Sequence, residues 1–217
     1  DFPYKDPQEI EVDRDGNIVW EWHAKTEYAD SKYRDVRSGD AGDWTHMNSV
    51  QRLADGTTLL SIRNWNLLIA VDSGSKTVWK TGAKQVPPPG TFSAEPPQCP
   101  HTPVMLENGN IIISESVKGS VIEWNPEKNR IVWEFPNSEQ ERDTWYFIRA
   151  AHRLPNGNTF IIDSRGQFLE VTADCDIVWQ ARLHNFRDLR PGQDKGIPQR
   201  SPCFNADRRG LPWYGGR

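Results

Sequence analysis

Side chains able to hold an oxyanion recur beside the first strands that we expect in this chain. His46 and His101 stand at the same place, just before the first strand of consecutive repeats, and Asn48 follows His46 in the string DWTHMNSV. Arg63 belongs to the next strand, in the string SIRN, and a hairpin would return it to His46 and Asn48. An imidazole, an amide and a guanidinium suit a tetrahedral oxyanion, because arginine offers a bidentate fork and the others give single hydrogen bonds.

A convergent pair of imidazoles allows nucleophilic attack, general acid and base catalysis, or metal binding. His152 lies close to the same repeat position but is shifted, so that it aligns with Asn48 and Pro103. With His46 and His101 it could complete a metal site, which no carboxylate-rich spacing supports. By itself, His152 is more simply explained as a hydrogen-bonded structural residue. We therefore predict no cofactor and keep the metal site as an alternative.

These residues belong to a sequence that repeats. Each copy has an Asp-Gly or Asn-Gly turn, a β-branched strand, a third strand and a closing Val-Trp pair, and the copies span 46–79, 101–133 and 151–179. A truncated copy, EIEVDRDGNIVWEW, opens the chain with the last two strands. A repeat of about 46 to 59 residues built from four short strands is typical of propeller blades. We predict an all-β propeller with a partial blade at 8–24 and full blades at 46–82, 101–136 and 149–182.

The segments outside the blades predict contacts with other chains. Three full blades and a partial one would leave open strand edges, so we expect the tail, a second copy or partner chain, or a missing N-terminal portion to complete the ring. The tail at 184–217 is rich in Arg, Pro and Gly and is predicted to be extended. The charged insert at 25–42 is predicted to be a surface excursion. One repeat position carries tryptophans expected to pack between blades: Trp20, Trp79, Trp133 and Trp179.

Composition excludes several classes of protein. The net charge of -4 and the pI near 5.8 argue against a nucleic-acid partner, which would need a basic surface. The mean hydropathy of -0.74, with no apolar run near 18 residues, excludes a membrane span. The three cysteines show no zinc-ligand spacing and allow one disulfide and one thiol. No secretory signal is visible, although we expect a periplasmic or secreted location.

The chain resembles the arylsulfotransferase-type (ASST-like, PAPS-independent) β-propellers over roughly residues 8–180. The strings that carry the resemblance are EIEVDRDGNIVWEWHA, DWTHMNSVQRLADGTTLLSIRN, PHTPVMLENGNIIISES and AAHRLPNGNTFIIDSRGQFLEVTADCDIVW. The most specific pattern is DW-x-H-x-N-S-V followed by S-x-R-N. Two strings depart from the family: Pro100-His101-Thr102 stands where Gln-His-Asp is common, and Arg149-Ala150-Ala151 stands where small or hydroxylated residues are usual.

The resemblance implies transfer of a sulfuryl group from an aryl sulfate to a phenolic acceptor through a channel histidine. It gives His101 the role of the nucleophile and gives His46, Asn48 and Arg63 the role of holding the sulfate. A non-catalytic propeller that serves as an assembly or interaction subunit stays open as an alternative, favoured by the truncated blade count, the altered nucleophile string and the tail. The histidine metal site is a second alternative.

Overall fold

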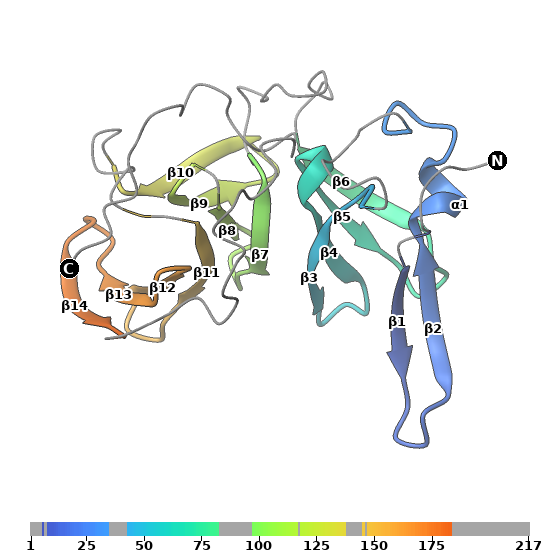
Figure 1. Ribbon diagram of the computed structural model, residues 1–217, viewed down its shortest axis with the longest axis horizontal. Coiled ribbons are helices and arrows are strands. Elements are labelled where there is room, and N and C mark those ends of the chain that lie inside the picture. The colour runs from blue at the N-terminus through green and yellow to red at the C-terminus, as the bar shows by residue number, and fades with distance from the viewer. Residues whose placement is uncertain are drawn as a thin grey trace, which may run out of the picture.

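The computed structural model describes residue 6 and residues 8–34, 43–82, 97–116, 118–137, 145 and 147–183. These residues form three four-stranded antiparallel sheets and one two-stranded sheet, arranged like propeller blades (Figure 1). The described part of the chain contains one short helix, α1 (Ala24–Tyr28), and one 3-10 turn, η1 (Arg63–Trp65). The prediction of an all-β propeller is confirmed. The predicted tail at 184–217 lies outside the described residues.

Each full sheet is a meander whose strands pair in chain order. The strands are β1 (Gln8–Val12) and β2 (Ile18–His23); β3 (Met47–Arg52), β4 (Thr58–Ile62), β5 (Leu67–Val71) and β6 (Thr77–Gly82); β7 (Pro100–Met105), β8 (Ile111–Glu115), β9 (Ser120–Asn125) and β10 (Arg130–Phe135); β11 (Ile148–Arg153), β12 (Thr159–Asp163), β13 (Gln167–Val171) and β14 (Ile177–Arg182). In Figure 1 the sheets follow one another from the β1–β2 hairpin on the right to β14 on the left. Strand β7 contacts β3 and β4 of the sheet before it, and β11 contacts β7 and β8. The first strand of each sheet is therefore the inner one.

Local sequence explains why these strands form. Every residue of β4, β5 and β8 is buried, as expected for strands rich in Leu and Ile that are covered by neighbouring sheets. The first hairpin of each full sheet turns at a glycine in the left-handed region: Gly56 (φ 87°), Gly109 (φ 80°) and Gly157 (φ 87°). A residue with a side chain would be strained there, so the Asp-Gly and Asn-Gly pairs fix the turns.

The repeated tryptophan position joins neighbouring sheets. Nε1 of Trp20 donates to the carbonyl oxygen of Asp72 at 3.1 Å, and Nε1 of Trp133 donates to that of Ala173 at 2.9 Å. Each acceptor belongs to the following sheet, so the predicted packing between blades is confirmed for these two residues. Trp179 occupies the same position in the last sheet and is 49% exposed.

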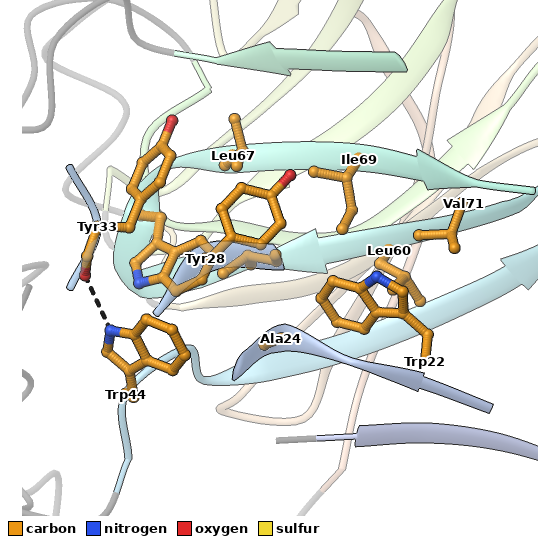
Figure 2. Close-up of a cluster of buried hydrophobic side chains, with 11 residues drawn as sticks. Trp22, Ala24, Tyr28, Tyr33, Trp44, Leu60, Leu67, Ile69 and Val71 are labelled. Carbon is orange, nitrogen blue, oxygen red and sulfur yellow. Dashed lines mark hydrogen bonds between the residues drawn. The ribbon is translucent and has the colours of Figure 1, made fainter. Parts of the chain in front are cut away.

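An aromatic cluster packs α1 and the partial sheet against the first full sheet (Figure 2). Tyr33 stacks on Trp65 with ring centroids 4.7 Å apart, and Trp44 meets Trp65 edge-on at 4.8 Å. Nε1 of Trp44 donates to the carbonyl oxygen of Tyr33 at 2.8 Å, the dashed line in Figure 2. In the described part of the 25–42 insert Tyr28 and Tyr33 are buried, whereas the other residues are exposed or half-exposed. The predicted surface excursion is therefore anchored to the first full sheet by two aromatic side chains.

Candidate functional site

The amino ends of the inner strands bring the candidate residues together. The same turn follows each inner strand, with the backbone N–H of Leu53, Leu106 or Leu154 bonded to the carbonyl oxygen four residues later. Counting back five residues from these leucines gives the second residue of each inner strand. Those residues are Asn48 in β3, His101 in β7 and Arg149 in β11. Three consecutive sheets thus present an amide, an imidazole and a guanidinium at equivalent positions.

This register corrects two alignments made from the sequence. His101 lies inside β7 and is equivalent to Asn48, whereas His46 precedes β3 and is equivalent to Cys99. His46 and Cys99 share a left-handed backbone conformation, each with φ 48°. His152 lies two residues before its leucine, in the place of Gln51 in the first sheet, and not opposite Asn48. The sequence alignment counted from the histidines, but the hairpin turns fix the register.

His46 is held by Asp43. Oδ1 of Asp43 accepts the backbone N–H of His46 at 2.9 Å, and Oδ2 is bonded to Nδ1 of the His46 ring. Burial opposes ionisation of Asp43, but its hydrogen bonds to His46 and the charges of His46 and Arg63 lower its pKa overall. Because a carboxylate only accepts, Nδ1 of His46 carries the hydrogen, and Nε2 is the ring nitrogen left for chemistry.

Arg63 lies in η1, directly after β4, and is 8% exposed. Burial lowers its pKa to about 10; the charge of Arg149 acts in the same direction, and the carboxylate of Asp43 opposes it. At neutral pH the guanidinium is charged. The hairpin therefore returns Arg63 to the surroundings of Asp43, the residue that holds His46.

The aromatic cluster fixes both segments that carry these side chains. Trp44 and Trp65, which flank Asp43 and Arg63 in the sequence, pack against each other. Asn64 ties the segments together, because its Nδ2 donates to the carbonyl oxygen of Asp43 at 2.9 Å and its backbone N–H donates to that of Thr45 at 3.1 Å. Buried aromatic packing thus fixes the segments that carry Asp43 and Arg63, the charged groups near His46.

His101 is held as a neutral imidazole with one nitrogen committed. Its Nδ1 lies 2.8 Å from the carbonyl oxygen of Arg149 and 2.9 Å from Oγ1 of Thr102. The hydroxyl of Thr102 donates to the same carbonyl oxygen at 2.7 Å, so Nδ1 of His101 is the donor to that oxygen. Burial lowers the pKa of His101 to about 4; the charges of Arg149, Arg63 and His46 add to this effect, and the bond to the carbonyl opposes it. The lone pair of the neutral ring therefore lies on Nε2.

Sequence reasoning did not select Arg149, which lies in the surroundings of His101 and Arg63. Its Nε donates to Oγ of Ser164 at 2.8 Å, and its guanidinium carbon lies 5.2 Å from the centre of the Phe147 ring. The charge of Arg149 acts on both His101 and Arg63, which places the three groups in one electrostatic neighbourhood. Counting from the turn leucines, as above, would have found Arg149 in the sequence.

Asn48 lies beside the strand of His101. Its Nδ2 donates to the carbonyl oxygen of Pro100 at 3.1 Å, and Oγ of Ser61 donates to the same oxygen at 2.9 Å. Asn48 therefore joins the first sheet to the residue before His101. Its Oδ1 is buried and has no hydrogen-bond partner within the described ranges.

The structure does not assemble the histidine metal site. His152 is exposed near the carboxyl end of β11, opposite Phe160, whereas His101 lies near the amino end of β7. No group of three His, Cys, Asp or Glu side chains among the described residues could hold a metal ion. The alternative with His46, His101 and His152 therefore gains no support from this register.

Residues 5–96 match the family model described as Arylsulfotransferase (ASST). Over this stretch, which is less than half of the chain, the sequence is similar to that family. The match includes Asp43, His46, Asn48 and Arg63 and stops before His101. It confirms the resemblance seen in the sequence, whereas the roles of the single residues rest on the geometry.

Solved structures resemble this chain in fold. A protein of unknown function from Bacteroides caccae has a TM-score of 0.52 at 14% identity, covering 81% of this chain and 59% of that one. Virginiamycin B lyase from Staphylococcus aureus has a TM-score of 0.50 at 12% identity, covering 80% and 48%. The WD40 beta propeller domain of Doa1 has a TM-score of 0.49 at 11% identity, covering 77% and 45%. A search of curated proteins found no match.

The chain thus spans about three fifths of the first of these proteins and about half of the lyase. No helix in the described part of the chain is long and apolar enough to cross a membrane. Cys99 forms a disulfide, and Cys175 carries a thiol that donates to the carbonyl oxygen of Glu134. Cys99 in a disulfide and Cys175 as a thiol agree with the one disulfide and one thiol that the sequence allowed.

Proposed function

We propose that this arylsulfotransferase-like propeller transfers a sulfuryl group from an aryl sulfate to a phenol through Nε2 of His101. The observation that carries the proposal is the state of His101, which donates from Nδ1 to the carbonyl oxygen of Arg149 and keeps a lone pair on Nε2. Because its pKa is lowered to about 4, the ring is neutral at ordinary pH and able to attack sulfur.

The proposed reaction has two displacements. In the first, the Nε2 lone pair forms a bond to sulfur while the bond between sulfur and the aryl oxygen breaks, and a phenolate leaves. In the second, the oxygen of an acceptor phenol bonds to sulfur, the bond from sulfur to Nε2 breaks, and the lone pair returns to nitrogen. His46 is the proposed proton donor to the first phenolate and acceptor from the second phenol, and Arg63 stabilises charge on the sulfuryl oxygens.

The test uses 4-nitrophenyl sulfate as donor and phenol as acceptor, with wild type, His101→Asn and His152→Asn. His101→Asn introduces the residue that the preceding blade has at this position, so it is a matched change. We expect it to lower transfer roughly a thousandfold or more, while His152→Asn transfers as the wild type does. Mass spectrometry of the wild type after the donor alone should show one added SO3 group. Transfer by His101→Asn at the wild-type rate contradicts the proposal.

One observation favours an assembly function as a second candidate. Trp179 lies at the position where Trp20 and Trp133 bond to the next sheet, yet it is 49% exposed. Phe160 lies 6.1 Å from Trp179 between ring centroids, and Phe168 lies 6.3 Å from Phe160. We propose that a further blade, from a second copy or a partner chain, covers this aromatic surface. Sedimentation of Trp179→Glu should then show a smaller particle than the wild type, and equal sizes contradict the proposal.

We also propose a periplasmic or secreted location, supported by the disulfide of Cys99, because disulfides persist in oxidising compartments. The chain has three cysteines. Thiol titration of the denatured protein should therefore find fewer than three thiols before reduction and three after it. Three thiols before reduction contradict this location.

A further inference from the structure

We propose that the exposed aromatic face of the third full sheet binds an arginine that ends the inner strand of a partner blade. Glu170 and Trp179, which lie opposite each other on β13 and β14, receive this arginine, and we call them the terminal pair. The inference rests on the assembly function proposed above. It deepens that function by naming the side chain that the partner must supply.

A glutamate opposite a tryptophan occurs at the same place in three of the four described sheets. The glutamate lies on the third strand of the blade pattern and the tryptophan on the fourth. The pairs are Glu11 with Trp20, Glu123 with Trp133, and Glu170 with Trp179. A carboxylate beside an indole ring suits a guanidinium, which forms charged hydrogen bonds and stacks on aromatic faces.

An arginine of the following sheet contacts the first of these pairs. Arg52 is the last residue of β3, the inner strand of the first full sheet. Its guanidinium carbon lies 5.1 Å from the centre of the Trp20 ring, and its Nη2 donates to Oε2 of Glu11. Its Nη1 donates to the carbonyl oxygen of Gly56 at 2.8 Å, in the turn of its own hairpin. The arginine therefore joins two sheets by a cation–π contact and a charged hydrogen bond.

The second pair is contacted in the same way. Arg153 is the last residue of β11, and its guanidinium carbon lies 5.3 Å from the centre of the Trp133 ring. Its Nη2 donates to Oε2 of Glu123 at 2.6 Å, and its Nη1 donates to the carbonyl oxygen of Gly157 at 2.9 Å. Two junctions between sheets thus use the same three side chains and the same turn.

The first full sheet supplies the contrasting case. Ala70 stands opposite Trp79 where the other sheets have the glutamate, and the next inner strand, β7, ends in Met105. Met105 and Trp79 pack against one apolar cluster. Glutamate in one sheet is therefore matched by arginine in the next, and alanine by methionine. Because the terminal pair contains a glutamate, it calls for an arginine.

The carboxylate of Glu170 is arranged like that of Glu123. Oε1 of Glu170 accepts the side-chain amides of Asn158 and Asn156 at 2.7 and 2.9 Å, and these bonds lower its pKa. Oε1 of Glu123 likewise accepts the amide of Asn110, while its Oε2 accepts the arginine. Within the described ranges no residue bonds to Oε2 of Glu170. Glu170 is thus a charged carboxylate with its second oxygen available to an arginine.

Apolar residues around the terminal pair favour a whole blade over a lone arginine side chain. Phe160 on β12 is half-buried and lies 6.1 Å from Trp179 between ring centroids. Counted from the turn leucines, its equivalents in the other full sheets are Leu59 and Ile112. Both are 0% exposed, because the following sheet covers them. A blade on the third full sheet would cover Phe160 in the same way.

The sequence of the partner follows from the two junctions. Its first hairpin should read Arg-Leu-x-x-Gly, as residues 52–56 and 153–157 do, because the turn glycine also holds the arginine. A second copy would have to give up its own contacts to supply this arginine, since both such arginines bind within their chain. We therefore assign the terminal pair to a partner blade with its own Arg-Leu-x-x-Gly hairpin.

The first experiment uses a peptide of residues 148–163, closed through its ends, which carries Arg153 in such a hairpin. Closure holds the hairpin before binding. Calorimetry measures Kd for this peptide and for its Arg153→Met version. We expect the arginine peptide to bind wild type about tenfold more tightly. Glu170→Gln protein should lose this preference, whereas Glu107→Gln, which changes an exposed glutamate in the turn after β7, should keep it.

The second experiment needs no partner. Arg153→Met, Glu123→Ala and the double variant form a double-mutant cycle, measured by urea unfolding of the full chain. We expect the two side chains to be coupled by about tenfold in the equilibrium constant of unfolding. Coupling below about twofold overturns the matching of glutamate with arginine on which the inference rests.

Equal Kd values for the two peptides overturn the inference, as do a preference that survives Glu170→Gln and binding of neither peptide. The assembly function still stands after such a result if Trp179→Glu gives a smaller particle than the wild type. Self-association of the wild type that Arg52→Met abolishes would make a second copy the occupant, and would overturn the assignment to a partner blade.

Discussion

Protonation of His101 should make the stability of this protein depend on pH in a way that one substitution removes. The pKa of the ring is about 4 in the folded chain, against an ordinary value of 6.5. In the unfolded chain the ring takes up a proton as pH falls through 6.5, while in the folded chain it stays neutral until about 4. The unfolded state therefore binds more protons between these values, and stability falls as pH falls.

The size of the pKa shift of His101 sets how strongly the free energy of unfolding depends on pH. Between about pH 7 and about pH 5, this single group should lower the free energy of unfolding by about 2 kcal/mol. Above the ordinary pKa both states hold a neutral ring, so the contribution vanishes there. The groups that face His101 are Arg149 on β11, Arg63 in η1 and His46 before β3, and all remain in the variant.

The assay is urea unfolding followed by tryptophan fluorescence, which the ten tryptophans make sensitive. We expect wild type to lose about 2 kcal/mol more than His101→Asn over this pH range. His152→Asn removes an exposed histidine from a neighbouring sheet and should follow the wild type. Equal pH dependence in wild type and His101→Asn would refute the reasoning, because the ring would then titrate alike in both states.

The same low pKa predicts that His101 takes up an SO3 group from the donor alone down to about pH 4, and Arg149→Ala should move this acid limit upward. Mass spectrometry of the protein after exposure to the donor at each pH tests this, and an equal acid limit in wild type and Arg149→Ala would contradict it. Trp133→Phe removes the bond to Ala173 and should lower the free energy of unfolding by about 1 kcal/mol. Trp179→Phe, at the exposed counterpart, should change it by less than about 0.5 kcal/mol in the same urea assay.

Local signals in the sequence were enough to predict the strands and turns of the blades. Asp-Gly and Asn-Gly pairs act on their own neighbours, so the turns at Gly56, Gly109 and Gly157 could be found without tertiary information. The family resemblance likewise rests on contiguous strings, and residues 5–96 match it. The anchoring of the insert at 25–42 was not predicted, since burial of Tyr28 and Tyr33 depends on Trp65 and Trp44, which lie further along the chain.

The candidate site could be predicted only in part. His46 and Arg63 stand in one motif, and Arg63 lies near Asp43 as a hairpin requires. Arg149 was passed over as a departure from a family pattern, because its charge matters only where three inner strands end together. The equivalence of His46 and His101 was wrong, since it matched residue types where the backbone register decides.

By itself, then, the sequence determined what is local and periodic: the strands, their tight turns, the tryptophan position and the family strings. Tertiary structure decided what depends on distance between sheets. It made the carbonyl oxygen of Arg149 the acceptor for His101, which fixes the tautomer of the ring. It also buried Arg63 beside Asp43 and set a second guanidinium near His101 and Arg63. Electrostatic and hydrogen-bond partners from separate blades meet only when the sheets pack, so no pattern within one repeat contains them.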